Sequence, residues 1–271
     1  MPGGITSSVH RLSVRLPAGA SVQVVLKRFT NPDWDDMPAV ARNEAAALTA
    51  VSAMPVPAPR LLGVSPDGAD TDGVPSLLMT RASGRVWLTP PDLDDWIRQL
   101  ASLLPVLHAG AAAVGTDPPR DPGALTVPAS ARRPGLWTAA QRVVATKAPP
   151  GGAVFVHGDY PHFTVLCARG RLSALVDWSS SRIAPPDTDV GHCRLNLAVL
   201  FSAEVAERFR RAYEADAGRR VDPWWDVHQL LTYDDSWQEF IPVQVAGRAP
   251  GDVRDMTARV EELLAAALAR A

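Results

Sequence analysis

The sequence predicts an α+β fold of two lobes, with an N-terminal lobe at residues 1–82 and a C-terminal lobe at residues 83–271. Two observations predict this division. The first 80 residues combine short alternating apolar runs with turn residues around one helical segment, whereas the remainder has mainly the apolar spacing of helices. A strand-rich part and a helix-rich part joined by one short segment favour two packed units with a cleft between them. A single mixed domain is the alternative.

The N-terminal lobe is predicted to contain two hairpins and one helix. In order, its elements are strands at 12–16 and 22–29, a helix at 39–54, and strands at 61–64 and 76–80. Apolar residues alternate along the first strand, and the Pro-Ala-Gly-Ala sequence that follows it supplies a turn. Pro66-Asp67-Gly68 supplies the turn of the second pair. The lobe is therefore expected to be a small antiparallel sheet with one helix.

The C-terminal lobe is predicted to be mainly helical. Its elements are helices at 91–109 and 136–147, strands at 154–156, 165–168 and 172–177, and further helices near Asp189, Ala203, Trp224 and Asp252. Pro105 is expected to bend or shorten the first helix, because proline lacks a backbone N–H. The segment 115–134 is rich in proline, arginine and glycine and is expected to be a surface loop.

The composition excludes several classes of protein. The net charge of −2 gives no global attraction to nucleic acid, and no apolar stretch approaches the roughly 20 residues that cross a membrane. The N-terminus lacks an export signal, so a cytoplasmic location is expected. Cys167 and Cys193 are too few for a disulfide framework and are expected to be buried free thiols. Of the 27 basic residues, only Lys27 and Lys147 are lysines.

Lys27 and Glu44 form a candidate buried ion pair. Lys27 shares one side of its strand with Val25 and Phe29, and Glu44 lies on the apolar face of the helix that follows. A buried carboxylate needs a partner, and Lys27 is the nearest basic candidate. Such a pair can aim an ammonium group at the α- and β-phosphates of a nucleotide. A solvent-facing lysine at a sheet edge is the alternative.

The N-terminal residues 3–8 contain two glycines and three hydroxyl side chains immediately before the first strand. This composition suits a loop that covers phosphates, with Ser7 as the candidate contact. A disordered tail is the alternative.

Two aspartates follow apolar strands in the C-terminal half. The strand 154–156 leads into His157-Gly158-Asp159-Tyr160, and about 18 residues later another strand ends in Val176-Asp177-Trp178. Carboxylates at the tips of neighbouring strands suit phosphoryl transfer, because one can deprotonate a hydroxyl while the other holds Mg²⁺. Both could instead be ordinary turn residues that end strands.

This pattern resembles the aminoglycoside phosphotransferase and choline kinase superfamily, whose signature runs roughly HGDxxxxNVL, a hairpin and DW. The resemblance implies a protein-kinase-like fold and an ATP-dependent O-phosphotransferase that acts on a small hydroxylated molecule with ATP or GTP and Mg²⁺. It implies these roles for individual residues: Asp159 as the catalytic base, Asp177 as a metal ligand, Lys27 with Glu44 as the phosphate clamp, the backbone from Thr80 to Ala82 as the adenine contact, and His157 and Asp189 as supports of the catalytic loop.

Thr164 stands where that family has a metal-binding asparagine. A threonine hydroxyl can ligate Mg²⁺ but is expected to bind it more weakly than an amide oxygen. The alternative function is therefore a catalytically impaired relative that binds a nucleotide or small molecule without efficient transfer. His157, Asp159 and His162 could also form a small metal-hydrolase cluster, although that interpretation leaves Asp177 unused.

The segment 221–240 is the candidate acceptor site, since it holds five acidic residues, no lysine or arginine, and several aromatic residues. The candidate contacts are Asp222, Trp225, Asp226, Asp234, Asp235 and Trp237. Acidic and aromatic groups together suit a hydroxylated ligand that is cationic or has an apolar face, such as an aminoglycoside, a macrolide or an amino alcohol. Tryptophans in the core and acids on a solvated helix face are the alternative. The expected partner is thus a small molecule, with no nucleic acid and no membrane.

Overall fold

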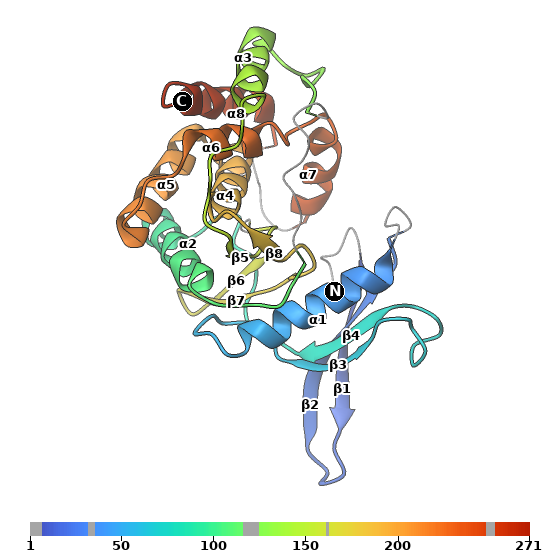
Figure 1. Cartoon of the computed structure of the whole chain (residues 1–271). Coiled ribbons are helices and arrows are strands. Elements are labelled where there is room, and N and C mark those ends of the chain that lie inside the picture. Colours follow the sequence, from blue (N-terminus) through green and yellow to red (C-terminus); the bar gives the residue numbers. More distant parts are fainter. Residues whose placement is uncertain (1–6, 32–35, 116–124, 161–162, 248–252) are drawn as a thin grey trace.

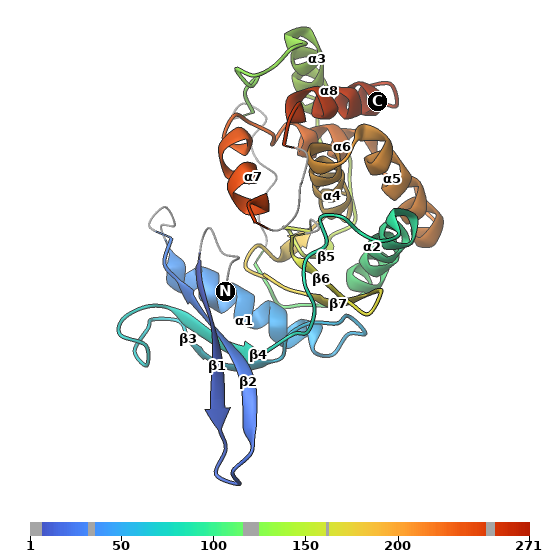
Figure 2. The same cartoon turned by 180° about the vertical axis from the view of Figure 1, so that it is seen from behind.

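The computed structural model describes residues 7–31, 36–115, 125–160, 163–247 and 253–271. It has the predicted two lobes, a small one built on an antiparallel sheet and a larger one built mainly of helices (Figure 1). Seen from behind, helix α1 lies between the sheet and the larger lobe (Figure 2). Asn43 of α1 joins the two lobes by donating to the carbonyl oxygens of Ser179 and Ser181 at 3.1 and 2.7 Å.

The small lobe contains a four-stranded sheet with the order β1-β2-β4-β3. Its elements are β1 (Ser7–Arg15), β2 (Ser21–Phe29), α1 (Met37–Val51), β3 (Leu61–Ser65) and β4 (Ser76–Thr80). The side chain of Asp36 caps α1 by accepting a hydrogen bond from Ala39 N at 2.8 Å. In the register, Lys27 lies between Val9 of β1 and Leu77 of β4, so it belongs to an inner strand rather than to a sheet edge.

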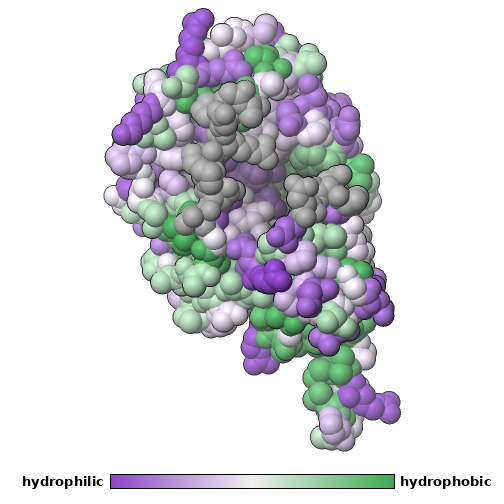
Figure 3. All heavy atoms as spheres, turned by 45° about the vertical axis from the view of Figure 1, so that its right-hand side comes forward, coloured by the Kyte–Doolittle hydropathy of each residue, from purple (hydrophilic) through white to green (hydrophobic). Residues whose placement is uncertain are grey.

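The β1–β2 hairpin extends beyond the body of the small lobe, and hydrophobic side chains gather on it (Figure 3). These side chains are 37–39% exposed and are Leu12, Val14, Leu16 and Val22. The alternating apolar residues that predicted this strand therefore belong to a two-stranded hairpin. This hairpin is covered only near its base, where Val24 and Phe29 are buried.

The large lobe holds seven helices and four short strands among the described residues. The helices are α2 (Leu93–His108), α3 (Pro134–Val144), α4 (Asp187–Leu200), α5 (Ala203–Ala217), α6 (Pro223–Leu230), α7 (Trp237–Val245) and α8 (Met256–Leu268). The strands are β5 (Val154–Val156), β6 (Val165–Ala168), β7 (Arg171–Leu175) and β8 (Arg182–Ala184). Helix α4 packs against α5, α6 and α8, and it is buried on nearly every side. It is therefore the central support of the loops around β5 and β8.

Several sequence-based expectations need correction. The strands before Asp159 and Asp177 are not neighbours, because β5 pairs with β8 whereas β7 pairs with β6. Strand β8 and helix α7 were not predicted as separate elements; β8 is only three residues long and α7 contains Pro242. Pro105 does not end α2, which continues to His108. Loss of a single N–H leaves the flanking turns intact, and Ala109 N still donates to Pro105 O at 3.1 Å.

Two expectations about burial and membranes can be compared with the structure. Cys167 and Cys193 are free and buried, as predicted, and burial raises the pKa of Cys167 to about 11. Within the described ranges, no helix is both long enough and apolar enough to cross a membrane.

Candidate active site

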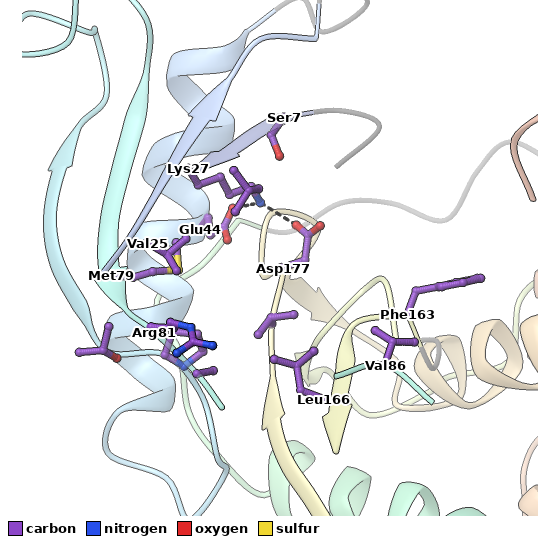
Figure 4. A pocket seen from close by; sticks show the side chains of 15 residues that line it. Ser7, Val25, Lys27, Glu44, Met79, Arg81, Val86, Phe163, Leu166 and Asp177 are labelled. Atoms are coloured by element: carbon purple, nitrogen blue, oxygen red, sulfur yellow. Dashed lines mark hydrogen bonds and ion pairs between the residues drawn. The ribbon is translucent and has the colours of Figure 1, made fainter. Parts of the chain in front are cut away.

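Lys27 is clamped between two carboxylates, one from each lobe. Its Nζ donates to Glu44 Oε2 at 2.6 Å and to Asp177 Oδ1 at 2.7 Å (Figure 4). Lys27 is only 5% exposed, so it is not the solvent-facing lysine of the alternative interpretation. Burial by itself would lower the pKa of Lys27, but the carboxylates of Asp177 and Glu44 outweigh it and raise that pKa. The ammonium group is therefore held charged between the lobes.

The two carboxylates of this clamp differ in their surroundings. Glu44 is 1% exposed, and burial raises its pKa despite the attraction of Lys27. The side chain of Asp177 is 37% exposed; burial opposes its ionisation, but Lys27 and the hydroxyl of Ser179 lower its pKa. Asp177 also adopts a left-handed backbone conformation with φ of 65°, which costs a non-glycine residue on the order of 1 kcal/mol. Asp177 thus presents an ionised, partly exposed carboxylate from a strained backbone, and such a carboxylate is suited to bind a cation.

A cavity of about 190 Å³ opens beside the clamp. Six of the residues predicted to contact nucleotide or metal line it: Ser7, Lys27, Glu44, Thr80, Ala82 and Asp177. Val25 and Met79 of the small lobe and Leu166 of the large lobe supply apolar walls (Figure 4). An apolar slot that ends at an ammonium and a carboxylate has the shape and chemistry for a flat base with a charged tail.

Two polar groups of Thr80 are already hydrogen-bonded to the backbone of Arg60. Its N–H donates to Arg60 O at 2.9 Å, and its Oγ1 accepts from Arg60 N at 2.8 Å. Contacts from the 80–82 segment to a base would therefore have to come mainly from the residues after Thr80.

Asp189 holds the backbone of the loop that leads to Asp159. It is fully buried; its Oδ1 accepts from Gly158 N at 2.8 Å, and its Oδ2 accepts from His157 N at 2.8 Å. His108 Nε2 donates to the same Oδ2 at 3.1 Å. Burial would raise the pKa of Asp189, but these donors lower it. Gly158 has φ of 80°, and a Cβ there would lie 2.0 Å from Ser180 O. Only glycine therefore fits at the position before Asp159.

His157 connects the two aspartate-bearing segments. Its Nε2 lies 3.1 Å from Val176 O, and a carbonyl can only accept, so Nε2 carries the hydrogen. Its Nδ1 then accepts from Asp159 N at 3.3 Å. Burial lowers the pKa of His157, which favours this neutral form. The His157 imidazole therefore links the backbone of Val176, the residue before Asp177, to the backbone of Asp159.

Asp159 itself is partly open, with its side chain 42% exposed. Its carbonyl oxygen accepts a hydrogen bond from Thr164 Oγ1 at 3.1 Å. Thr164 is buried, so this hydrogen bond to the backbone of Asp159 is shielded from solvent. The neighbours of Asp159 line two cavities, since Phe163 belongs to the one described above and Gly158 to a second one.

Magnesium bound together with nucleotide phosphates fits these groups. Such a Mg²⁺ takes one or two protein carboxylates and completes its shell with phosphate oxygens and water. Asp177 supplies one partly open carboxylate, whereas Thr164 is buried, donates its hydroxyl to Asp159 O and is not among the described residues that line the cavity. Within the part of the chain that the structure describes, no three His, Cys, Asp or Glu side chains cluster as a metal site on their own. His162, named in the metal-hydrolase alternative, lies outside the described residues.

Gly158, the residue before Asp159, lines a second cavity of about 500 Å³. Three of the predicted acceptor contacts line it, namely Trp225, Asp234 and Trp237. Other lining residues were not singled out from the sequence, and they include Arg182, His192, His228 and Phe240. Arg182 and His192 come from elements outside the 221–240 segment, so its composition did not point to them.

The other three predicted acceptor residues are occupied elsewhere and do not line this cavity. Asp222 caps α6 by accepting from Trp224 N at 2.8 Å. Asp226 is fully buried and forms ion pairs with Arg194 and Arg270. Asp235 accepts from Ala129 N and Ser130 N at 2.7 and 3.0 Å. The acidic count of the segment therefore overstates the negative charge of the cavity.

Comparison with known proteins decides the family. The sequence model of the phosphotransferase enzyme family matches residues 5–224. The chain belongs to the phosphotransferase enzyme family. This confirms the resemblance found in the HGD and DW segments. A curated relative of this phosphotransferase-family chain, the uncharacterized protein YcbJ of Bacillus subtilis (strain 168), is 27% identical over 171 residues. That match covers 58% of this chain, which spans about half (53%) of the relative.

Solved structures show that the family member has the expected kinase-like fold. One is a thermostable mutant of aminoglycoside phosphotransferase APH(4)-Ia with ADP and hygromycin B; it has a TM-score of 0.64 and 16% identity, covering 100% of this chain and 92% of that one. A choline/ethanolamine kinase family protein from Mesorhizobium loti has a TM-score of 0.59 and 20% identity, covering 99% and 90%. Amicoumacin kinase hAmiN, in complex with AMP-PNP, Ca²⁺ and Ami, has a TM-score of 0.61 and 13% identity, covering 97% and 86%.

Glu44→Gln is expected to weaken binding of Mg·ATP to this phosphotransferase-family protein about tenfold, or ~1.4 kcal/mol. The substitution keeps the shape of the side chain but removes the charge that holds Lys27 on the small-lobe side, so Lys27 is left to Asp177. Titration calorimetry measures the change. Glu204→Gln, at an exposed position on α5, is the matched control. Equal affinities of the Glu44→Gln and control variants would contradict the clamp.

Proposed function

We propose that this protein transfers the γ-phosphoryl group of ATP or GTP to a hydroxyl group of a small molecule. One observation carries the proposal: the Lys27 ammonium is held at 2.6 and 2.7 Å between Glu44 and Asp177 on the wall of an apolar cavity. The segment around Asp159 contributes Phe163 to that cavity and Gly158 to a second one. Phosphoryl transfer requires a donor site and an acceptor site with a base nearby, and Asp159 contacts His192, which lines the second cavity. A reaction that consumes ATP also agrees with the cytoplasmic location expected from the sequence.

On the donor side, the base would lie between Val25, Met79 and Leu166, with Ala82 offering backbone contacts. Lys27 would bind the phosphates, and Ser7 at the start of β1 would cover them. Asp177 and Thr164 would hold Mg²⁺, which when bound neutralises charge on the phosphates. The contact between Lys27 and Asp177 would give way as phosphate oxygens enter between them.

On the acceptor side, Asp159 would accept the proton of the attacking hydroxyl. Its backbone is fixed by His157 and Asp189, and its carboxylate contacts His192, which lines the acceptor cavity. Lys27 would stabilise the charge that spreads over the transferred group. The proton leaves the hydroxyl as the new oxygen–phosphorus bond forms and the bond to the nucleotide breaks.

The acceptor cavity favours a molecule with an apolar face and few positive charges. Trp225, Trp237 and Phe240 supply aromatic surface, and among the described lining residues Asp234 is the one carboxylate, opposed by the guanidinium of Arg182. Asp234 also accepts from Ser236 N at 2.9 Å. A polycationic aminoglycoside would find little charge to pair with here. A macrolide or an amino alcohol with an apolar body fits better.

The function is tested by incubating purified protein with Mg·ATP or Mg·GTP and a panel containing erythromycin, hygromycin B and choline. ADP or GDP release is followed in solution, and phosphorylated acceptor is identified by mass spectrometry. Transfer to the macrolide in excess of transfer to hygromycin B is the expected result. Nucleotide binding without any phosphorylated product would instead support the impaired, ligand-binding alternative.

Thr164→Asn is expected to lower the Mg²⁺ concentration needed for half-maximal turnover about tenfold, because an amide oxygen binds the ion better than a hydroxyl. Calorimetric titration of Mg²⁺ into the nucleotide complex provides a second measure. Thr164→Val, which removes the hydroxyl at similar volume, should raise the requirement. Turnover that appears only in Thr164→Asn, and not in the parent chain, would show that the natural protein is catalytically impaired.

A further inference from the structure

Helix α4 presents one partly exposed residue, His192, to the acceptor cavity. Every other residue from Asp187 to Leu200 is buried, whereas the His192 side chain is 20% exposed and lines the cavity. A central helix that is otherwise closed to solvent therefore opens at a single imidazole. Neither the fold nor the packing of α4 against its neighbours requires a titratable group at this place.

The imidazole of His192 contacts the proposed catalytic base directly. Its Nε2 lies 3.1 Å from Asp159 Oδ1. A carboxylate has only acceptor oxygens, so Nε2 carries the hydrogen and donates it. Among the described residues, no hydrogen bond reaches Asp159 Oδ2. The two oxygens are thus unequal: one is held by His192 and the other remains for an incoming hydroxyl group.

The same face of α4 also holds the backbone on which Asp159 sits. Asp189 and His192 are three residues apart, and side chains at this spacing share a helix face. Asp189 accepts from the N–H groups of His157 and Gly158, and His192 donates to the carboxylate of the next residue. One helix face therefore restrains both the backbone and the side chain of the catalytic loop.

Contacts between three helices fix the position of His192. At the preceding residue, Gly191, a Cβ would lie 2.7 Å from Gln229 Cβ, so α4 sits tightly against α6. The ring of Trp237 from α7 approaches the His192 ring edge-on, with centroids 6.5 Å apart. Asn196 Nδ2 donates to His192 O at 3.0 Å within the helix. The donor nitrogen is therefore placed by three helices rather than by a flexible loop.

We propose that His192 is a positioning residue for phosphoryl transfer: it holds Asp159 Oδ1 so that Oδ2 faces the acceptor hydroxyl. This inference rests on the function proposed above. Without the hydrogen bond, the half-exposed Asp159 side chain can rotate among several conformers. Misplacement of a reacting group by about 1 Å can cost on the order of 100-fold in rate.

The test compares His192→Phe with His192→Gln in the intrinsic hydrolysis of Mg·ATP, in which water takes the place of the acceptor. Phenylalanine keeps a ring against Trp237 but has no donor, and kcat is expected to fall about 10- to 100-fold with KM for ATP unchanged. Glutamine has an N–H donor at similar reach and should recover most of the loss. In the Asp159→Asn background, His192→Phe should cause no further loss. His10→Phe, at an exposed site on β1, is the control.

A second measurement does not depend on turnover. Imidazole ¹⁵N NMR should show His192 with hydrogen on Nε2 in the parent protein, and that resonance should shift in Asp159→Ala. Equal loss of kcat in both His192 variants, an additive loss in the double variant, or an unprotonated Nε2 would each overturn the proposal. If the parent protein hydrolyses no ATP and phosphorylates no acceptor, the proposed function fails, and the NMR result alone decides whether His192 holds Asp159.

Discussion

Asp159→Ala is expected to lower the rate of phosphoryl transfer by about 10²–10⁴-fold while leaving the affinity for Mg·ATP within about twofold. Asp159 lies on the loop between the two cavities and contacts none of the groups that form the Lys27 clamp. Its loss removes the proton acceptor for the hydroxyl, but Lys27, Glu44 and Asp177 stay in place. The effect should therefore appear in kcat, measured by ADP release with saturating nucleotide, and not in nucleotide binding measured by calorimetry.

Two further variants make this prediction specific. Asp159→Asn keeps the shape of the side chain and its contact with His192 but cannot take a proton, so its loss of kcat should be similar to that of Asp159→Ala. Asp216→Ala removes an exposed carboxylate from α5 and should leave kcat unchanged. Retained turnover in Asp159→Ala would refute the role of Asp159 as base. A parallel loss of nucleotide affinity would place it in the donor site instead.

Asp226→Ala is expected to reduce the free energy of unfolding by about 3–5 kcal/mol. Asp226 and Arg194 are both fully buried, and Asp226 also pairs with Arg270 near the C-terminus. Burial lowers the pKa of Arg194 to about 9, although the nearby Glu207 opposes this. Removing Asp226 would leave this buried guanidinium with Glu207 as its remaining carboxylate partner, at the junction of α4, α5 and α6.

Chemical denaturation measures the loss, and Asp222→Ala is the matched control in the same helix. Asp222 only caps the N-terminus of α6, so its removal should cost about 1 kcal/mol. Equal costs for the two variants would contradict the buried pair. At temperatures where the Asp226→Ala protein remains folded, its KM for the acceptor should equal that of the parent. A raised KM for the acceptor would instead indicate that Asp226 contributes to acceptor binding.

The ion pair of Lys27 and Glu44 could be predicted from the sequence because local rules place each residue. Strand alternation put Lys27 on the same side as Val25 and Phe29, helical spacing put Glu44 on a buried face, and a buried carboxylate requires a partner. The structure joins Lys27 and Glu44 at 2.6 Å. The contact of Lys27 with Asp177 spans 150 positions and follows from how the lobes pack, so neither residue's neighbours in the sequence reveal it.

The acceptor side could be predicted only in part. Trp225 and Trp237 line the cavity. Asp222 caps a helix, Asp226 pairs with the buried Arg194 and the partly exposed Arg270, and Asp235 binds a distant loop. These acidic residues share a segment but not a structural position, because Asp222 precedes α6, Asp226 lies within it and Asp235 lies before α7. His192 was missed because its contact with Asp159 joins residues 33 positions apart, although the spacing Asp189-x-x-His192 was visible in the sequence.

The sequence by itself determined the two-lobed α+β fold and the family, because these depend on hydrophobic period and on residues close to one another along the chain. The tertiary structure decided which strands pair, which carboxylates face a cavity and which are buried in ion pairs, and which imidazole holds the base. Those outcomes depend on how the helices pack against one another. Depending on that packing, an aspartate can cap a helix, form a buried ion pair or line a cavity. The composition of a segment carries no information about that choice.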